Sequence, residues 1–446
     1  MDRKLGLGVI VQDLIKGTSI YDQYIKLGNN DCLSRDELDS IQFSKFKKIV
    51  SHAYTNVPYY KRTFNEVNLH PSHIKCLDDI EKIPILTKDL ARKHQADLIA
   101  SNIKDYSVKK GKTGGTTGIP LEILKDEFDR SVTWASYYRW YRWIGIKQND
   151  KTLSLWGAKT VLSSSLRSKL YFKFSDYILN NVTVNSFGIS PDNIRSYYDF
   201  IITSDPKLIK GYLSSIFLIS QFMKSNSLPP NKSLKALACT TETLLPEVRS
   251  FIESVFQVPL YDQYGCGEVS SIAFECKNKN KHITQEHVYL EVLDESNSSL
   301  TGTPGRLIVT GLDNFVMPFI RYENGDVSSL LNETCSCNLP HKLLGDIEGR
   351  TIDTVTLSNG TKVHGVFFTD IFHELGYNTS LIKRFQIIQM PDLAIKLLLE
   401  VDEDLSPASI ESILRAISRF VKVDSIKQTN FIENSSSGKF RYIVSG

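Results

Sequence analysis

A segment rich in glycine and threonine has the residue types needed to hold a phosphate group. Residues 113–120 contain three glycines and three threonines. Glycines let backbone N–H groups approach an anion closely, and threonine hydroxyls add further donors. The composition therefore predicts a loop that cradles a triphosphate. Its contributing residues would be Thr113, Gly114, Gly115, Thr116, Thr117 and Gly118.

The residues before this segment exclude one common phosphate-binding loop. Gly111, Lys112 and Thr113 match the end of a Walker A motif. That motif also requires a glycine five residues before Gly111, where this chain has Tyr106. The chain is therefore not expected to be a P-loop NTPase. Taken alone, the segment could equally be an ordinary surface turn.

Cysteine and histidine residues form a second set with chemical potential. Cys276 and His282 are six positions apart, and Cys335 and Cys337 follow some fifty residues later. Three thiolates and one imidazole are a ligand set that zinc accepts in tetrahedral, structural sites. A closed site of this kind would join two loops and take no part in catalysis. Isolated thiols are the alternative interpretation, and the rival histidine ligands are His287 and His341.

Composition limits the classes of function. The 446 residues carry 53 Lys and Arg against 50 Asp and Glu, a net charge of +3. That balance disfavours nucleic acid as a partner. No apolar run approaches the roughly 18 residues that a membrane span needs, and we expect neither a span nor a signal peptide. The seven cysteines are an odd number, which favours reduced or metal-bound thiols and a cytoplasmic location.

The order of predicted elements indicates an α/β fold. Residues 34–37 form a capping box at the start of an amphipathic helix that should end near Asn56, ahead of Pro58. Short apolar runs then alternate with helical stretches up to about residue 340, which is α/β patterning. Pro246 marks the start of one such helix, because proline is favoured at the first helical position. This large body should extend over residues 1–349.

The remaining residues, 350–446, predict a small α+β domain. Asn359 and Gly360 are a hairpin signal between two short strands. A helix should follow and end at Gly376, and a second should begin at Ser406 and Pro407. Strands are expected at residues 385–389 and 394–401, with a last strand at 426–432.

Five segments, taken in order, resemble one family of enzymes. The glycine- and threonine-rich loop is followed by an aromatic-Gly-x-x-Glu segment, a P-x-x-R-Y-x-x-G-D segment, a G-R-x-x-D segment and a terminal G-K-x-R segment. Together they resemble the motifs of the adenylate-forming (acyl-CoA synthetase-like) superfamily. The four later segments are residues 261–268, 318–326, 349–353 and 437–441.

Three other segments resemble one branch of that superfamily. Residues 52–60, 83–88 and 211–214 are similar to the phenylacetate-CoA ligase branch, and within it to CapK-like proteins of surface-polysaccharide clusters. The resemblance covers nearly the whole chain. It implies a large ATP- and acyl-binding body and a small mobile C-terminal lid domain, with the nucleotide between them.

The resemblance implies a nucleotide site built from named residues. Tyr264 would lie against the adenine ring, since a flat amphipathic ring offers stacking. Glu242, after Thr241, would line the same pocket. Asp326 would accept hydrogen bonds from the ribose hydroxyls. Glu268 would hold Mg²⁺, a cation that prefers carboxylate and phosphate oxygens.

The resemblance also implies a catalytic lysine on the mobile domain. Lys439 would place a cation between the attacking carboxylate and the α-phosphate in the transition state. Arg350 would stay near the ribose and phosphate while the small domain turns about a hinge at Asp353. Relatives often have a hydroxyl residue where this chain has Gly114, and a hydroxyl or larger residue in place of Gly267. The efficiency of adenylation is therefore left open.

The activity implied is that of an AMP-forming carboxylate ligase. A small carboxylic acid would be activated as acyl-AMP and passed to an amine, hydroxyl or thiol acceptor, with CoA as one acceptor. The CapK-like similarity implies a role in capsular polysaccharide biosynthesis. The alternatives are an acyl-CoA ligase, an adenylyl transferase and a non-catalytic nucleotide-binding scaffold; a homodimer is also left open. Segments expected to face the acyl group contain Trp156, Asn185, Phe187 and Tyr212.

Overall fold

Helices form the first part of the chain. The computed structural model describes all residues except 1–6, 113–120, 148, 157–175, 187–188, 190–191, 351–353, 359–361, 365–367, 369–370, 373–374, 378–380, 434–439 and 446. The early helices are α1 (Leu7–Lys16), α2 (Ile20–Asn30), α3 (Arg35–Asn56), α4 (Pro58–Glu66) and α5 (Lys88–Lys93).

The predicted capping box at the start of α3 is confirmed. The side chain of Ser34 accepts a hydrogen bond from the backbone of Glu37, and Glu37 accepts one from the Ser34 backbone. The helix ends at Asn56, as predicted, because Pro58 begins the next helix. The buried face includes Gln42, whose side chain donates to the carbonyl of Val288.

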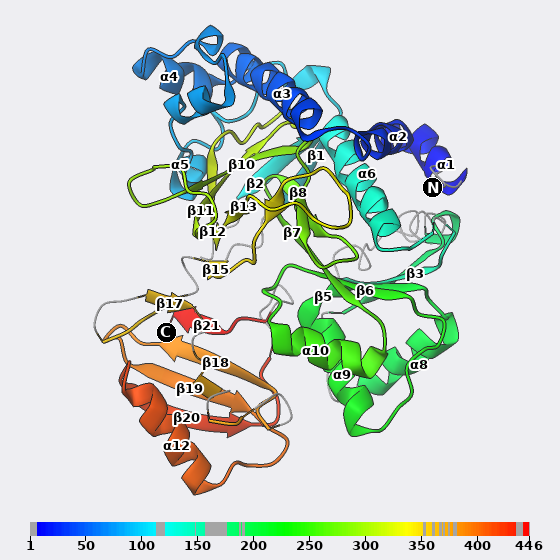
Figure 1. Cartoon of the computed structure of the whole chain (residues 1–446), viewed down its shortest axis with the longest axis vertical. Helices are drawn as coiled ribbons and strands as arrows, with labels where there is room; N and C mark the ends of the chain where they lie inside the picture. The colour runs from blue at the N-terminus through cyan, green and yellow to red at the C-terminus, as the bar shows by residue number, and fades with distance from the viewer. Residues whose placement is uncertain are drawn as a thin grey trace.

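A nine-stranded mixed sheet forms the centre of the body (Figure 1). Five strands are parallel, and the inner strands β5 and β6 are largely buried between helices, whereas the edge strand β4 is only partly buried. The sheet order is β13-β14-β9-β8-β7-β6-β5-β3-β4. The parallel strands are β3 (Thr152–Trp156), β4 (Asn181–Asn185), β5 (Leu208–Tyr212), β6 (Ala236–Thr240) and β7 (Leu260–Cys266); the others are β8 (Ser270–Glu275), β9 (Lys281–Ile283), β13 (Leu330–Leu331) and β14 (Leu343–Leu344).

Helices cover both faces of the parallel strands. Side chains of α6 (Glu127–Trp143), including Trp140, pack on one face. The other face is covered by α8 (Ile194–Ser204), α9 (Leu213–Ser225) and α10 (Pro246–Phe256), as Figure 1 shows. The predicted start of α10 at Pro246 is confirmed. Burial on both faces makes this sheet a rigid base for residues at its strand ends.

A smaller antiparallel sheet lies beside the large one. Its order is β10 (Val288–Leu293), β11 (Gly305–Gly311), β12 (Tyr322–Ser328) and β15 (Gly349–Arg350). A hairpin of β1 (Val108–Lys112) and β2 (Glu122–Asp126) flanks the glycine- and threonine-rich segment.

The expected alternation with helices up to residue 340 is wrong after Leu260, because residues 260–350 contain strands and turns only. Antiparallel strands need only short turns, which leaves no room for crossover helices.

The C-terminal part has its own core, a two-stranded sheet (β16-β17) and a four-stranded sheet (β20-β19-β18-β21). Its strands are β16 (Thr354–Thr356), β17 (Lys362–His364), β18 (Arg384–Gln389), β19 (Ile395–Glu400), β20 (Val423–Thr429) and β21 (Ile443–Ser445), and α12 (Pro407–Ser418) packs on them. The predicted last strand at 426–432 is wrong: β20 begins and ends three residues earlier, where it pairs with β19, and β21 follows it. The fold class, a large α/β body with a smaller α+β part, is confirmed. None of the described helices is long and apolar enough to cross a membrane.

Candidate active site

The carboxyl ends of the parallel strands bring together residues that are far apart in sequence. β3 lies between β4 and β5, so successive strands are added on opposite sides of it. Ligands of α/β proteins bind at such a switch point, outside the carboxyl ends of the strands. Here the rings of Trp156 and Tyr212 stack with centroids 4.8 Å apart. Trp156 is 38% exposed, so the stack borders solvent.

Strand β12 carries three polar residues toward the end of β7. Tyr322, Asn324 and Asp326 occupy every second position of β12, and Asn324 donates to Asp326 over 3.2 Å across an irregularity of the strand at Gly325. The Tyr264 hydroxyl donates to Asp326 Oδ2 over 2.6 Å, and Asn324 donates to the Tyr264 oxygen over 2.7 Å. The two predicted nucleotide residues Tyr264 and Asp326 are thus in direct contact, and both are buried.

Glu268 lies on the turn between β7 and β8. It is 6% exposed, and its Oε1 accepts a hydrogen bond of 2.8 Å from the Tyr322 hydroxyl. A Cβ at Gly265 would lie 2.1 Å from the Ser270 carbonyl oxygen, so glycine is needed where the two strands meet. Among the described residues Glu268 has no ion pair. A buried carboxylate without a counter-ion fits a bound cation such as Mg²⁺.

The end of β6 contains a strained threonine. Thr241 has φ of 79°, in the left-handed region that β-branched residues avoid. Its Oγ1 is buried and has no hydrogen-bond partner among the described residues. The next residue, Glu242, accepts hydrogen bonds from Ser214 N (2.7 Å) and Ser214 Oγ (2.9 Å) at the start of α9. An unpaired hydroxyl at a strained position beside the strand ends fits a ligand contact.

Other predicted residues are only partly placed or lie outside the described residues. Arg350 on β15 is the register partner of Asp326 on β12, which puts their backbones side by side. The predicted phosphate loop (Thr113, Gly114, Gly115, Thr116, Thr117 and Gly118), the hinge residue Asp353 and the lysine Lys439 lie outside the described residues.

The sequence analysis did not name Tyr322 and Asn324 as residues of the site. It also did not recognise that Arg321 has a structural role. Tyr322 and Asn324 bond directly to Glu268 and Tyr264, and their alternation with Asp326 was the available signal. Arg321, inside the same motif, is buried and pairs with Glu291, with N–O distances of 2.8 and 3.1 Å. It also donates to the carbonyl of Ile83, so it joins two motif segments structurally.

The four predicted metal ligands come together. The ligand atoms of Cys276, His282, Cys335 and Cys337 all lie within 4.8 Å of one another. Cys276 Sγ is 3.6 Å from Cys335 Sγ, and Cys337 Sγ is 3.2 Å from His282 Nε2. Two sulfurs bound tetrahedrally at 2.3 Å from one zinc ion would be about 3.8 Å apart. The cluster therefore has the spacing of a closed metal site.

The four ligands differ in their protonation without a metal. Burial lowers the pKa of His282 to about 4, which keeps the imidazole neutral and able to bind a cation. Burial would raise the pKa of Cys335, but hydrogen bonds from Asn280 and the Cys337 backbone lower it overall. Burial raises the pKa of Cys337 to about 12 and also raises the pKa of Cys276, so a metal would have to displace a proton from each of these thiols.

The two rival histidines are engaged elsewhere. His287 Nδ1 lies 2.8 Å from Asp313 Oδ2, and His341 Nε2 lies 3.3 Å from Asp31 Oδ1. Both are buried. Neither belongs to the group of converging ligand atoms.

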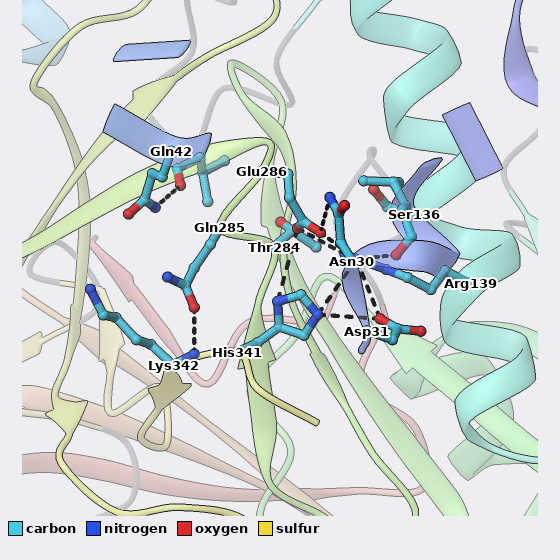
Figure 2. Close-up of polar contacts among 12 residues, drawn as sticks. Asn30, Asp31, Gln42, Ser136, Arg139, Thr284, Gln285, Glu286, His341 and Lys342 are labelled. Atoms are coloured by element: carbon cyan, nitrogen blue, oxygen red, sulfur yellow. Dashed lines mark hydrogen bonds and ion pairs between the residues drawn. The ribbon is translucent and has the colours of Figure 1, made fainter. Parts of the chain in front are cut away.

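A buried ionic network lies next to the cysteine cluster (Figure 2). Arg139 of α6 pairs with Glu286 at 2.7 Å and with Asp31, at the end of α2, at 3.6 Å. Asn30 donates to the same Glu286 oxygen over 3.1 Å. Burial would raise the pKa of Glu286, but the charge of Arg139 holds it well below its usual value. The network ties α2, α6 and residue His341 into one unit.

Comparisons with known proteins show what the chain is similar to. The family model of the CapK C-terminal domain matches residues 355–446. Protein CapK of Staphylococcus aureus is 25% identical over 300 residues, which are 67% of this chain and 64% of CapK. The phenylacetate-coenzyme A ligase of Aromatoleum evansii is 27% identical over 383 residues, 83% of this chain and 80% of that ligase. The enzyme class predicted from the sequence, the AMP-forming ligases, is the class of the phenylacetate-coenzyme A ligases among these relatives.

Solved structures of a 2-hydroxyisobutyryl-CoA ligase share the fold at about one-fifth sequence identity. In its postadenylation state the TM-score is 0.76 at 19% identity, covering 94% of this chain and 92% of the ligase. In its thioesterification state the TM-score is 0.64. The chain is therefore a homologue of CapK and of the phenylacetate-coenzyme A ligases, with the fold of adenylate-forming CoA ligases.

Proposed function

We propose that this chain is an ATP-dependent, AMP-forming carboxylate ligase. In the first step a carboxylate oxygen attacks the α-phosphorus of ATP, giving acyl-AMP and pyrophosphate. In the second step a nucleophile attacks the acyl carbon and AMP leaves. The observation that carries the proposal is the buried contact of Tyr264 with Asp326. On the adjacent strand end, the Thr241 hydroxyl has no partner among the described residues.

Each residue of the site would have a separate task. Asp326, with Arg350 beside it, would hold the ribose, while Tyr264 and Glu242 border the adenine. Thr241 would donate to the nucleotide and so gain the partner that it lacks. Glu268 would hold Mg²⁺, which would neutralise phosphate charge when bound.

The charge on the reacting groups requires further cations and donors. A carboxylate and a phosphate repel one another, so donors fixed around the α-phosphate lower the barrier. The loop Thr113–Gly118 would bind the phosphates and Lys439 would approach from the C-terminal domain. Residues 1–349 would form the binding body and residues 350–446 the lid, turning at Asp353 between the two steps.

The acid would bind beside the stacked rings of Trp156 and Tyr212. These rings lie at the switch point of the sheet, one strand from Asn185, which ends β4. The region is aromatic, so an acid with an apolar body is favoured.

The acceptor is best assigned from the similarity to CapK. We propose an amine or hydroxyl acceptor in capsular polysaccharide biosynthesis, because the family match over 355–446 is to the CapK C-terminal domain. The second candidate is transfer to CoA, favoured by the similarity to phenylacetate-coenzyme A ligases. The cysteine cluster would hold a structural zinc in either case.

The test is acid-dependent release of pyrophosphate from ATP and Mg²⁺. Aryl, fatty, amino and uronic acids are supplied in turn. With the accepted acid, Lys439→Ala should lower the rate by about 10² to 10³, the cost of losing one charge contact at a reacting centre. CoA and amines are then added to identify the acceptor.

Two results would contradict the proposal. Calorimetric binding of ATP without turnover of any acid would favour a nucleotide-binding scaffold. Pyrophosphate release that is indifferent to Lys439→Ala would exclude the proposed catalytic cation. Asp326→Asn serves as the control for nucleotide binding, since it should weaken ATP binding in calorimetry.

A further inference from the structure

The connection that carries Lys439 must cross one end of the C-terminal sheet. The strand order is β20-β19-β18-β21, so β20 and β21 are the two outer strands. Of the chain between them, the described residues 430–433 lie at the end of β19 and residues 440–442 lie beside the start of β18. Arg384 and Glu400 are register partners at that end. They therefore lie where the connection crosses.

Arg384 and Glu400 form a buried ion pair that hydrogen-bonds to the backbone of Ile432, near the start of this connection. Arg384 donates to Glu400 Oε2 through Nε (3.0 Å) and Nη2 (2.6 Å). The same Oε2 accepts from Ile432 N at 2.7 Å, and Arg384 Nη2 donates to Ile432 O at 2.8 Å. The two side chains are 2% exposed each. Both backbone groups of Ile432 are thus fixed by one ion pair.

The Arg384 guanidinium also contacts Phe440, near the end of this connection. Its carbon lies 4.6 Å from the centroid of the Phe440 ring and 5.3 Å from that of Phe431. Phe440 is buried and directly follows Lys439. An arginine plane between aromatic faces gains cation–π attraction that a lysine at the end of a flexible chain would not reproduce.

The residues after Phe440 are held by the neighbouring strand. Gln386 Nε2 donates to the carbonyl of Arg441 over 2.9 Å, and the Ile387 amide donates to the carbonyl of Tyr442 over 2.7 Å. The chain is therefore fixed on both sides of residues 433–439, with Arg384 touching both sides.

We infer that Arg384, held by Glu400, is a positioning residue for Lys439. This inference rests on the proposed function, in which Lys439 supplies the cation for adenylation. Arg384 acts through the backbone on either side of that lysine and touches no substrate. Because reaction rates depend steeply on the placement of a charged group, loosening these anchors lowers turnover more than it lowers ATP binding.

The test uses variants that remove the bridge without leaving a buried charge alone. Arg384→Lys keeps the charge but loses the planar, multiple contacts. Arg384→Met combined with Glu400→Leu removes both charges and retains the apolar volume. In acid-dependent pyrophosphate release each should lower kcat by about 10- to 100-fold and leave KM for ATP within about threefold.

The effect of Arg384→Lys in a chain that lacks Lys439 distinguishes a positioning role from a general loss of structure. In a Lys439→Ala background, Arg384→Lys should lower the residual rate by less than about twofold, because the two residues act as one unit. Equal losses in both backgrounds would overturn the inference.

A second measurement does not depend on activity. Brief digestion of the folded chain with trypsin should cleave after Lys439 and Arg441 about tenfold faster in Arg384→Lys and in the double variant than in the wild type. The matched control is Lys383→Met, which breaks the adjacent pair with Asp402 but touches neither Phe431 nor Phe440. Cleavage at the rate of this control would refute the inference. A wild type without pyrophosphate release would refute the proposed function alone, since the cleavage rates would still be decisive.

Discussion

At the scale of single residues, Thr241 shows a conflict between stability and binding. A β-branched residue with positive φ costs about 1–3 kcal/mol in backbone strain, and its buried hydroxyl lacks a partner among the described residues. Thr241→Gly should therefore raise the free energy of unfolding by about 1 kcal/mol. It should also weaken ATP binding several-fold, measured by calorimetry, because the proposed hydroxyl contact is lost.

A second left-handed residue provides the control for Thr241. Gln257 has φ of 56° at the end of α10, where it caps the helix. Gln257→Gly should stabilise the chain similarly in urea denaturation and leave ATP affinity unchanged. Weaker ATP binding in both variants would argue against a specific role for Thr241.

Lys210 provides a prediction about pH. Its amine donates to the Tyr141 hydroxyl over 3.3 Å, and it has no ion pair among the described residues. Burial lowers its pKa from 10.5 to about 8, although the charge of Asp176 opposes this. The unfolded chain then binds more protons than the folded one between pH 8 and 10.5, so the Lys210 contribution to stability should rise with pH in that window.

The measurement compares Lys210→Met with the wild type in urea at pH 7 and pH 9.5. At pH 7 the variant should be more stable by about 1–2 kcal/mol, since a half-buried lysine has part of its desolvation cost relieved by water. The difference should shrink at pH 9.5, where the folded wild type holds a neutral amine. A difference that grows with pH would show that Lys210 is well solvated or paired.

At the scale of elements, the buried ion pairs of Arg139 should stabilise the packing of α2 against α6. Removing one partner of a fully buried ion pair leaves an uncompensated charge and costs about 3–5 kcal/mol. Arg139→Met should therefore destabilise the chain by this amount in chemical denaturation. Arg142 also pairs with Asp31 but is partly exposed, so Arg142→Met should cost about 1 kcal/mol or less. Equal effects would mean that water reaches both pairs.

The cysteine cluster should behave as a clip between the turn after β8 and the segment at residues 335–337. We expect about one zinc ion per chain by elemental analysis. Removal by a strong chelator should lower the Tm by about 5 °C, because a structural metal stabilises the folded state. Cys335→Ser should lose the metal, whereas Cys76→Ser, at an exposed cysteine outside the cluster, should keep it. A metal-free wild type with unchanged Tm on chelation would exclude the clip.

Sequence reasoning succeeded for elements whose signals are local. The capping box at Ser34 and the prolines at Pro246 and Pro407 mark helix starts that the structure confirms. The bounds of β20 and the existence of β21 were missed because they depend on pairing with β19 and β18, which adjacent residues do not reveal. The cysteine cluster was predictable from ligand chemistry, whereas the Arg139 network was not, since its charged residues look like surface residues in the sequence.

At the scale of the whole molecule, two aromatic residues connect the C-terminal domain to the body. Phe431 and Tyr442 pack against the core that includes residues of α9 and α10, and Figure 1 shows this domain beside α10, to its left. Burial, with the nearby charges of Glu242 and Glu247, raises the pKa of Tyr442.

Tyr442→Ala should loosen this docking. A compact chain of 446 residues has an expected radius of gyration of about 22 Å, and the variant should exceed the wild type in small-angle scattering. Tyr377→Ala is the control, because Tyr377 packs within the C-terminal core instead. An unchanged radius of gyration in Tyr442→Ala would show that other contacts keep the C-terminal domain packed against the body.

The arrangement of strands also sets the order in which the molecule should assemble. The sheet of β18–β21 uses only residues 384–445, whereas the body joins segments much farther apart in the chain: Gln42 of α3 donates to the carbonyl of Val288 on β10, 246 residues away. Structures that depend on distant contacts form slowly. During refolding, the C-terminal sheet should gain protection from hydrogen exchange before α3 and β10 do. For a time, the sheet of the C-terminal domain would then be formed while the body on which that domain packs is still incomplete.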